Sequence, residues 1–307
     1  MPSKRHLLLC FDAFGTLFKP RMPIAQQYAE VARQCGLIGV AEHQLQDAFR
    51  AAFKSEAKAH PNYGRATGMG AEKWWANIIR KTFSPLLSDE QALPDELVPR
   101  LLHRFSSDEG YSMVPQLPYL LKVLKEPRSG RLFDKLVIGV ITNSDDRVPK
   151  ILSSFGLRVS PLRYGTEPDR VSAVVAPGTD YDIDFHCMSY DVGFEKPDRK
   201  IFEAAEDMLR VVLRGRFGAS STASDLTNWD KIYVGDDYDK DVVGALNSGW
   251  QAAFLEPGNE SEPRHDIKKL TSLQPQLQPE GPSALFGHRL VSVPDLKTLV
   301  HHLVSET

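Results

Sequence analysis

Two parts of the sequence carry carboxylates in positions suited to chemistry. An apolar run near the start, LLLCF, ends in Asp12 and continues as AFGTL. A charge at the end of a buried strand is costly unless it is compensated, and this turn offers backbone N–H groups and the hydroxyl of Thr16. Asp12 is therefore a candidate nucleophile or metal ligand. The later stretch VGDDYDKDVVGA gathers carboxylates that repel one another unless a hard cation such as Mg²⁺ neutralises them: Asp236, Asp237, Asp239 and Asp241.

Two other segments offer groups suited to an anion. Thr142 and Asn143 follow the apolar run VIGVI and precede a predicted helix whose entry is marked by Asp145. A hydroxyl and exposed amides at such a point can hold an anion, but the same residue types also form an ordinary N-cap. Lys196, in GFEKPDRKIF, stands at the start of another predicted helix and can present a positive charge to a phosphoryl group or an anionic nucleophile.

A calcium-binding loop is the alternative interpretation of the acidic stretch. With Asp237 as the first ligand, Asp239 and Asp241 fall at ligand positions. Val242, however, occupies the position that requires glycine, and Ser248 the position that requires glutamate. The apolar run before the loop also predicts a strand where a calcium hand has a helix. These features argue against a calcium hand.

The elements that must position these groups are predicted from apolar runs. Runs at 7–12, 136–144, 231–237 and 250–256, with a weaker one at 183–193, are typical of strands buried on both faces of a parallel sheet. Helical patterns lie between them, such as 195–209 with Pro197 in its first turn. This alternation predicts a doubly wound α/β sheet. Ligands bind at the carboxyl ends of such strands, which is where the candidate residues lie.

Residues 21–112 show helical periodicity and almost no strand signal, so we predict an inserted helical bundle there. A glycine-rich stretch within it, HPNYGRATGMGAEKWW, is either a loop that contacts substrate or a plain connector between helices. Two later segments, 214–230 and 256–289, lack periodicity and are interpreted as surface excursions. Residues 293–304 form a predicted closing helix.

Composition narrows the possible partners. The 307 residues carry a formal charge of −3, and both signs are interspersed, so no basic face predicts a nucleic-acid or membrane partner. The three cysteines, Cys10, Cys35 and Cys187, lack metal-type spacing and suggest reduced thiols in an intracellular protein. The apolar run before Asp12 is far shorter than a membrane span, so it is interpreted as a core strand.

Taken together, these motifs resemble those of the haloacid dehalogenase-like hydrolase superfamily in order and spacing. Residues 1–18 and 113–307 resemble its Rossmann-like core, and 19–112 resemble the helical cap of its capped subfamily I. More narrowly, HPNYGRATGMGAEKWW, FEKPDRKIFEAA and VGDDYDKDVVGALNSGW resemble the haloacid dehalogenase-like hydrolase domain-containing protein 3 group, which is related to the rhythmically expressed gene 2 protein. The cytoplasm is the default expectation for its location, and the resemblance adds the nucleus as a further one.

The resemblance also implies roles for individual residues. Asp12 would attack the substrate, and Thr142 and Lys196 would hold the phosphoryl group or the nucleophile. Groups expected to contact substrate are Thr16, Thr142, Asn143 and Lys196. Groups expected to bind Mg²⁺ are Asp12, the backbone carbonyl of Phe14, Asp236 and Asp241, with Asp237 as an alternative ligand.

The sequence departs from the pattern at one position. Phosphatases of this superfamily usually carry a second aspartate two residues after the nucleophile, where this chain has Phe14. That aspartate protonates the leaving group and then activates water, and losing such a group typically costs on the order of 10² to 10⁴ in rate. The dehalogenases of the superfamily also have an aromatic residue there and need no metal. They therefore do not need the acidic stretch that this chain keeps.

We therefore expect a Mg²⁺-dependent, phosphatase-type hydrolase that acts on a small phosphorylated metabolite through an Asp12 phosphoryl-enzyme, with activity weakened by Phe14. One alternative is a catalytically impaired protein that binds a phosphorylated ligand or a protein partner. The other is a metal-independent dehalogenase.

Overall fold

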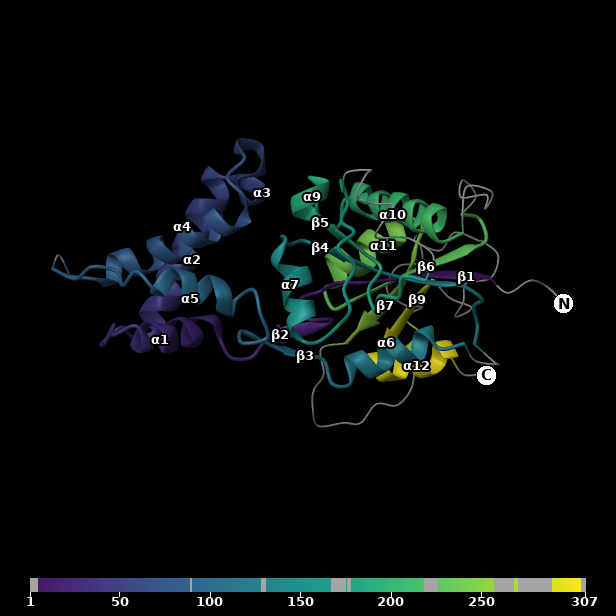
Figure 1. Ribbon diagram of the computed structural model, residues 1–307, viewed down its shortest axis with the longest axis horizontal. Helices are drawn as coiled ribbons and strands as arrows, with labels where there is room; N and C mark the ends of the chain where they lie inside the picture. Colours follow the sequence, from purple (N-terminus) through teal and green to yellow (C-terminus); the bar gives the residue numbers. More distant parts are fainter. Residues whose placement is uncertain are drawn as a thin grey trace. The chain divides into compact units, whose positions relative to one another are not determined.

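The computed structural model describes residues 5–88, 90–127, 131–166, 175, 178–217, 226–256, 268–269 and 289–304. The chain divides into two compact units (Figure 1). The first, called the core unit here, comprises Met1–Phe18, Val114–Asn143 and Gly156–Thr307. The second, called the helical unit, comprises Lys19–Met113 and Ser144–Phe155. The sequence assigned Ser144–Phe155 to the core, whereas in the structure this segment packs with the helical unit.

A seven-stranded sheet organises the core unit, in the order β5-β4-β1-β6-β7-β9-β8. Its strands are β1 (His6–Phe11), β4 (Leu136–Thr142), β5 (Phe185–Met188), β6 (Trp229–Gly235), β7 (Gln251–Leu255), β8 (Lys268–Lys269) and β9 (Leu290–Val293). All neighbours are parallel except β8, which is antiparallel to β9. The predicted α/β, Rossmann-like fold with a parallel sheet is confirmed. Because Phe11 pairs with both Val140 and Val234, the carboxyl ends of β1, β4 and β6 are neighbours.

Helices cover both faces of this sheet. They are α6 (Leu117–Lys125), α9 (Ser189–Val192), α10 (Arg199–Phe217), α11 (Gly244–Asn247) and α12 (Leu296–Val304). Helices α10 and α11 lie on one face, and α6 and α12 pack together on the other (Figure 1). Ile201 and Leu209 of α10 join Leu8 of β1 in one buried apolar cluster. This two-sided burial explains why the strands are continuous apolar runs.

Helix α10 begins later than the sequence predicted. The pattern placed Pro197 in its first turn, but the helix starts at Arg199. The reason is local, because a side-chain oxygen of Asp198 accepts a hydrogen bond from the backbone N–H of Lys200 and caps the helix there. Lys196 therefore lies in the loop before the helix.

The helical unit contains the predicted helices and a short ribbon that was not predicted. Its helices are α1 (Ile24–Gln34), α2 (Glu42–Ala59), α3 (Pro61–Gly64), α4 (Ala71–Phe83), α5 (Leu97–Arg104) and α7 (Arg147–Ser154), with one-turn 3-10 segments at Arg65–Thr67 and Ser84–Leu86. Strands β2 (Phe18–Pro20) and β3 (Tyr111–Met113) form a two-stranded sheet. Strands this short leave no periodic signal in a sequence.

A buried charged cluster explains why α7 belongs to the helical unit. The indole N–H of Trp75 donates to Oδ2 of Asp145 over 2.8 Å, and the guanidinium of Arg147 lies 4.0 Å from the centre of a Trp75 ring. Arg147 also donates from Nε to Oδ1 of Asp145 over 2.8 Å. Burial acts to raise the pKa of Asp145, but the Arg147 cation outweighs it and lowers the pKa. Asp145 thus neutralises Arg147 and is not part of an anion site.

Other predicted features have mixed outcomes. All three cysteines are free, and Cys10 and Cys187 are buried. The predicted closing helix is confirmed as α12. The predicted surface excursion 214–230 is wrong at its ends, because 214–217 belong to α10 and 229–230 to β6. Most of 218–228, and most of the second predicted excursion, 256–289, lies outside the described residues. Among the described helices, none combines the length and the apolar character that crossing a membrane requires.

The buried histidine of β5 makes stability depend on pH. Burial lowers the pKa of His186 from 6.5 to about 3, and the neighbouring Leu162 backbone opposes this only in part. Between about pH 3 and pH 6.5, His186 therefore binds a proton in the unfolded chain but stays neutral in the folded protein. We expect this residue to lower the free energy of unfolding by up to about 1.4 kcal/mol per pH unit as the pH falls from 6.5 towards 3.

Urea unfolding of wild type and a His186→Leu variant between pH 4 and pH 7.5 checks this expectation. The variant should lose less stability on acidification than wild type. Replacing the exposed His43 by Leu provides the control and should leave the wild-type pH dependence in place. Parallel stability curves for wild type and His186→Leu would contradict the assignment.

Candidate active site

Asp12 is held at the carboxyl end of β1, the central strand of the sheet. Its backbone N–H donates to the carbonyl of Val234 over 2.9 Å, which extends the pairing of β1 with β6 by one residue. Its side chain is 13% exposed, so the carboxylate remains accessible. Oδ1 lies 3.0 Å from Nζ of Lys196, but it accepts no well-aligned hydrogen bond from the residues described.

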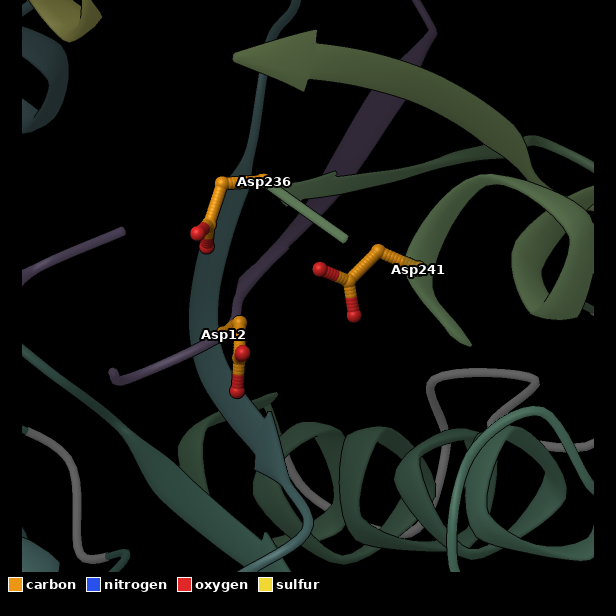
Figure 2. A group of neighbouring side chains, drawn as sticks. All are labelled: Asp12, Asp236 and Asp241. Atoms are coloured by element: carbon orange, nitrogen blue, oxygen red, sulfur yellow. The ribbon is translucent and has the colours of Figure 1, made fainter. Parts of the chain in front are cut away.

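Two more carboxylates converge on Asp12. Asp236 directly follows β6, and Asp241 lies in a one-turn π-helix, η3 (Tyr238–Val243). Each of the three aspartates offers an oxygen within 4.8 Å of the others, and Figure 2 shows the three side chains close together. The hydroxyl of Thr16 donates to Oδ1 of Asp236 over 2.9 Å, so this predicted substrate contact instead orients a carboxylate.

Two glycines make room for this convergence. Gly15 has φ +83°, and a Cβ there would lie 2.2 Å from Oδ2 of Asp236. A Cβ on Gly235 would lie 2.1 Å from Oδ2 of Asp241. Both distances are far inside van der Waals contact, so a side chain at either position would displace a carboxylate. The glycines after Asp12 and before Asp236 are thus required by the site itself.

Lys196 supplies the positive charge of the site. The lysine side chain is only 1% exposed. Its Nζ lies 2.7 Å from Oδ1 of Asp241, 3.0 Å from Oδ1 of Asp12 and 2.7 Å from the hydroxyl of Tyr233. This residue is therefore not the solvated lysine that surface positions usually carry, and its ammonium is fixed beside the candidate nucleophile.

Asn143 fixes the backbone that carries Lys196. Its side-chain Oδ1 accepts from the backbone N–H of Lys196 over 2.6 Å, and its Nδ2 donates to the carbonyl of Lys196 over 2.9 Å. Both ends of the amide are thus engaged by one residue. The structure places Asn143 on the lysine loop and does not show it as a free donor for substrate.

Tyr233 is a functional residue that the sequence analysis missed. Its buried hydroxyl accepts from Nζ of Lys196 and donates to the carbonyl of Ile141 over 2.7 Å. Burial, with the nearby carboxylates, raises the pKa of Tyr233 well above its usual range, so the phenol keeps its proton. The available signal was a hydroxyl-bearing residue in KIYVGDD, but a tyrosine in a strand is ordinarily part of the core.

We expect Tyr233→Phe to lower the free energy of unfolding by about 1–3 kcal/mol. The substitution leaves the ammonium of Lys196 and the carbonyl of Ile141 each short of a buried partner. Urea unfolding measures the change, and Tyr238→Phe, which alters a half-buried tyrosine of η3, serves as the control. Equal stability of the two variants would mean that the Tyr233 hydroxyl does not support the lysine.

The electrostatics of the site favour a bound cation. Burial raises the pKa of Asp236, and the charge of Asp12 raises it further against the opposing Thr16 hydrogen bond. Burial also raises the pKa of Asp241, although Lys196 opposes this. Three carboxylates therefore face one ammonium. Carboxylate oxygens are the ligands that hard divalent cations prefer, and the unsatisfied Oδ1 of Asp12 fits such a role.

The other predicted site residues lie at or beside this group. Thr142 is buried at the end of β4, and no described residue donates to its hydroxyl or accepts from it. Asp237 turns away: its carboxylate accepts from the backbone N–H of Lys240 over 3.0 Å and pairs with the ammonium, which lowers its pKa. Asp237 is not in the group formed with Asp12.

Phe14 brings no acid to the site. Its ring meets that of Phe18 edge-on, with 4.8 Å between centroids. The carboxylate that usually stands two residues after the nucleophile is therefore replaced by an apolar contact. The arrangement can position a nucleophile and bind a cation, but residue 14 cannot transfer a proton.

Comparison with known proteins identifies the family of the chain. Residues 7–249 match the haloacid dehalogenase-like hydrolase family. An uncharacterized hydrolase of Schizosaccharomyces pombe is 30% identical over 259 residues, which cover 83% of this chain and 94% of that protein. The haloacid dehalogenase-like hydrolase domain-containing protein 3 of Danio rerio is 28% identical and covers 87% of this chain and 95% of its own. The rhythmically expressed gene 2 protein of Drosophila melanogaster is 28% identical, covering 82% and 83%.

A solved structure gives the same fold. The 2-haloacid dehalogenase of Pseudomonas syringae pv. Tomato DC3000 superposes with a TM-score of 0.52 at 16% identity, covering 97% of this chain and 98% of that one. At this identity the likeness concerns the fold alone.

Proposed function

Because this chain belongs to the haloacid dehalogenase-like hydrolase family, we propose that it is a Mg²⁺-dependent hydrolase of small phosphorylated metabolites. One observation carries the proposal. The accessible carboxylate of Asp12 lies beside the ammonium of Lys196 and forms a group with two further carboxylates, Asp236 and Asp241. A dehalogenase nucleophile needs no such acidic group. A phosphatase needs one to bind the cation that neutralises the negative charge of its phosphate substrate.

The first chemical step follows from the position of Asp12. Its carboxylate oxygen forms a bond to phosphorus, and the bond from phosphorus to the leaving oxygen breaks with its electron pair going to that oxygen. Lys196 orients the attacking carboxylate and balances its charge. Mg²⁺, held by Asp12, Asp236, Asp241 and the Phe14 carbonyl, would neutralise the phosphoryl oxygens so that an anionic nucleophile can approach them.

The second step returns Asp12 to its carboxylate form. Water attacks phosphorus, the bond between phosphorus and the Asp12 oxygen breaks with its electron pair returning to the carboxylate, and the proton of the water passes to a phosphoryl oxygen as phosphate is released. Residue 14 takes no part in either proton transfer, because the Phe14 ring can neither give a proton to the leaving oxygen nor take one from the attacking water. Substrates whose leaving group departs as a stable anion, such as acyl and aryl phosphates, should therefore react fastest. Thr142 is proposed to hold the phosphoryl group, and the helical unit to act as the substrate-selecting cap.

A phosphate-release screen tests the proposal. Acetyl phosphate, 4-nitrophenyl phosphate, sugar phosphates and nucleotides are each incubated with the full chain in Mg²⁺ and in EDTA. We expect release only with Mg²⁺, and faster release from the acyl and aryl phosphates. Absence of release from every substrate would overturn the proposal, as would activity that survives EDTA.

A catalytically impaired ligand-binding protein is the second candidate, and Phe14 is the observation that favours it. Such a protein would bind a phosphate ester in Mg²⁺ but release no phosphate from it. Isothermal titration with a substrate from the screen separates the two functions. A metal-independent dehalogenase is a third candidate, and halide release from 2-chloropropionate in EDTA would identify it.

A further inference from the structure

The helical unit contains a groove whose lining includes none of the candidate active-site residues. Its volume is about 640 Å³, and it runs between the segment that joins β2 to α1 and one face of α2. Cavities of roughly 300–1,000 Å³ are typical of small-molecule sites. The lining residues that matter to its chemistry are Lys19, Arg21, Ile24, Phe49 and Arg50.

The charges around this groove have one sign. Lys19, Arg21 and Arg50 line it, and no acidic residue does. This differs from the chain as a whole, in which 40 acidic residues outnumber 37 basic ones. Lys19 and Arg50 are exposed, and neither forms an ion pair with any residue in the described ranges. The groove therefore keeps an uncompensated positive charge.

Arg21, the third cation of the groove, is held in place by uncharged backbone carbonyls. Nη2 of Arg21 donates to the backbone carbonyl of Asp108 over 2.9 Å and to that of Tyr111 over 3.2 Å. Carbonyl groups carry no net charge, so the guanidinium is oriented but keeps its full positive charge. The remaining N–H groups of the Arg21 guanidinium can still donate hydrogen bonds to a carboxylate, sulfonate or phosphate.

The groove also has an apolar wall. Ile24 and Phe49 are half-buried there, and the Phe49 ring is fixed by an edge-on contact with Tyr28, 5.4 Å between centroids. An apolar surface beside fixed cations matches a ligand that has an apolar body and an anionic head. Inorganic phosphate alone would leave the apolar wall uncovered.

We propose that this groove binds an amphipathic organic anion: a carboxylate, sulfonate or phosphate ester on an aromatic or aliphatic body. None of the residues that line the groove belongs to the candidate active site, and the proposal does not depend on the proposed hydrolysis. Lys19 belongs to β2, the strand through which the chain enters the helical unit, so the ligand contacts that connecting segment directly.

The probe is 8-anilinonaphthalene-1-sulfonate, titrated into the full chain and followed by its fluorescence. We expect saturable binding at one site and at least a tenfold weaker Kd in a Lys19→Glu/Arg50→Glu variant, because the sulfonate then meets like charge. The matched control is Arg33→Glu/Arg80→Glu, which makes the same charge change at exposed residues of α1 and α4 outside the groove. Its Kd should stay within about twofold of wild type.

Three outcomes would overturn this proposal. The first is an equal loss of affinity in both double variants, which would mean that only net charge matters. The second is the absence of saturable binding. The third is displacement of the probe by a poly-glutamate peptide at lower concentration than by 1-naphthalenesulfonate, which would indicate an acidic protein partner. Since a sulfonate has no phosphate to release, an Asp12→Asn chain should bind the probe as wild type does, whatever its activity.

Discussion

Asp12→Asn is expected to lower the rate of phosphate release by at least about 10⁴-fold. The amide has nearly the shape of the carboxylate, but it cannot form the covalent intermediate. It also leaves the ammonium of Lys196 with one carboxylate partner fewer. The measurement is a discontinuous phosphate assay with acetyl phosphate in Mg²⁺.

The matched control for this variant is Asp239→Asn, which removes an exposed carboxylate from the same acidic stretch. Asp239 does not belong to the group formed by Asp12, Asp236 and Asp241, so its variant should keep wild-type activity to within about twofold. If Asp12→Asn retained a tenth or more of the rate, the nucleophile would have to be another group. Thermal unfolding of both variants separates lost chemistry from lost structure.

Phe14→Asp is expected to raise the rate of phosphate release from alkyl phosphates by on the order of 10² to 10⁴. The new carboxyl stands two residues after the nucleophile, where it can protonate the leaving oxygen and then deprotonate water. In the first step the gain should be much smaller for acetyl phosphate, because its leaving group needs no proton. Loss of the Phe14 ring contact with Phe18 also removes some stability.

Phe14→Asn separates proton transfer from the effect of removing the ring. It is similar in size and polarity to the aspartate variant but transfers no proton, so its rate on alkyl phosphates should stay at or below that of wild type. If Phe14→Asn and Phe14→Asp gave the same rate, the size of the Phe14 ring would limit the wild-type rate, and the missing proton transfer would not. If Phe14→Asp is active while wild type only binds, the impaired-protein candidate is correct.

The sequence predicted the parts of the site that depend on strand ends. Asp12 and Asp236 each follow a buried apolar run, and parallel strands bring such ends to one edge of a sheet. Their convergence in the structure therefore required only the alternation of strands and helices. The missing acid at Phe14 could be identified from the sequence as well, because its place is fixed relative to Asp12.

Other features depend on contacts between distant residues. The hydrogen bonds between Asn143 and the Lys196 backbone, and the one that Lys196 donates to Tyr233, join three separate segments of the chain, and no local pattern encodes them. The membership of Ser144–Phe155 in the helical unit depends on Trp75 reaching Asp145 across 70 positions of sequence. Local secondary-structure propensity carries no information on contacts between residues so far apart in sequence. Only the structure identifies them.

The amide of Asn143 has a mechanical consequence. Asn143 is the last residue of a core segment, and the peptide bond that follows it leads into the stretch assigned to the helical unit. Its side chain grips the backbone of Lys196 by two short hydrogen bonds. A displacement of the backbone at Ser144 would therefore act, through Asn143, on the loop that places Lys196 beside Asp12. The ammonium beside Asp12 is thus held by the residue at which the chain passes from the core unit to the helical unit.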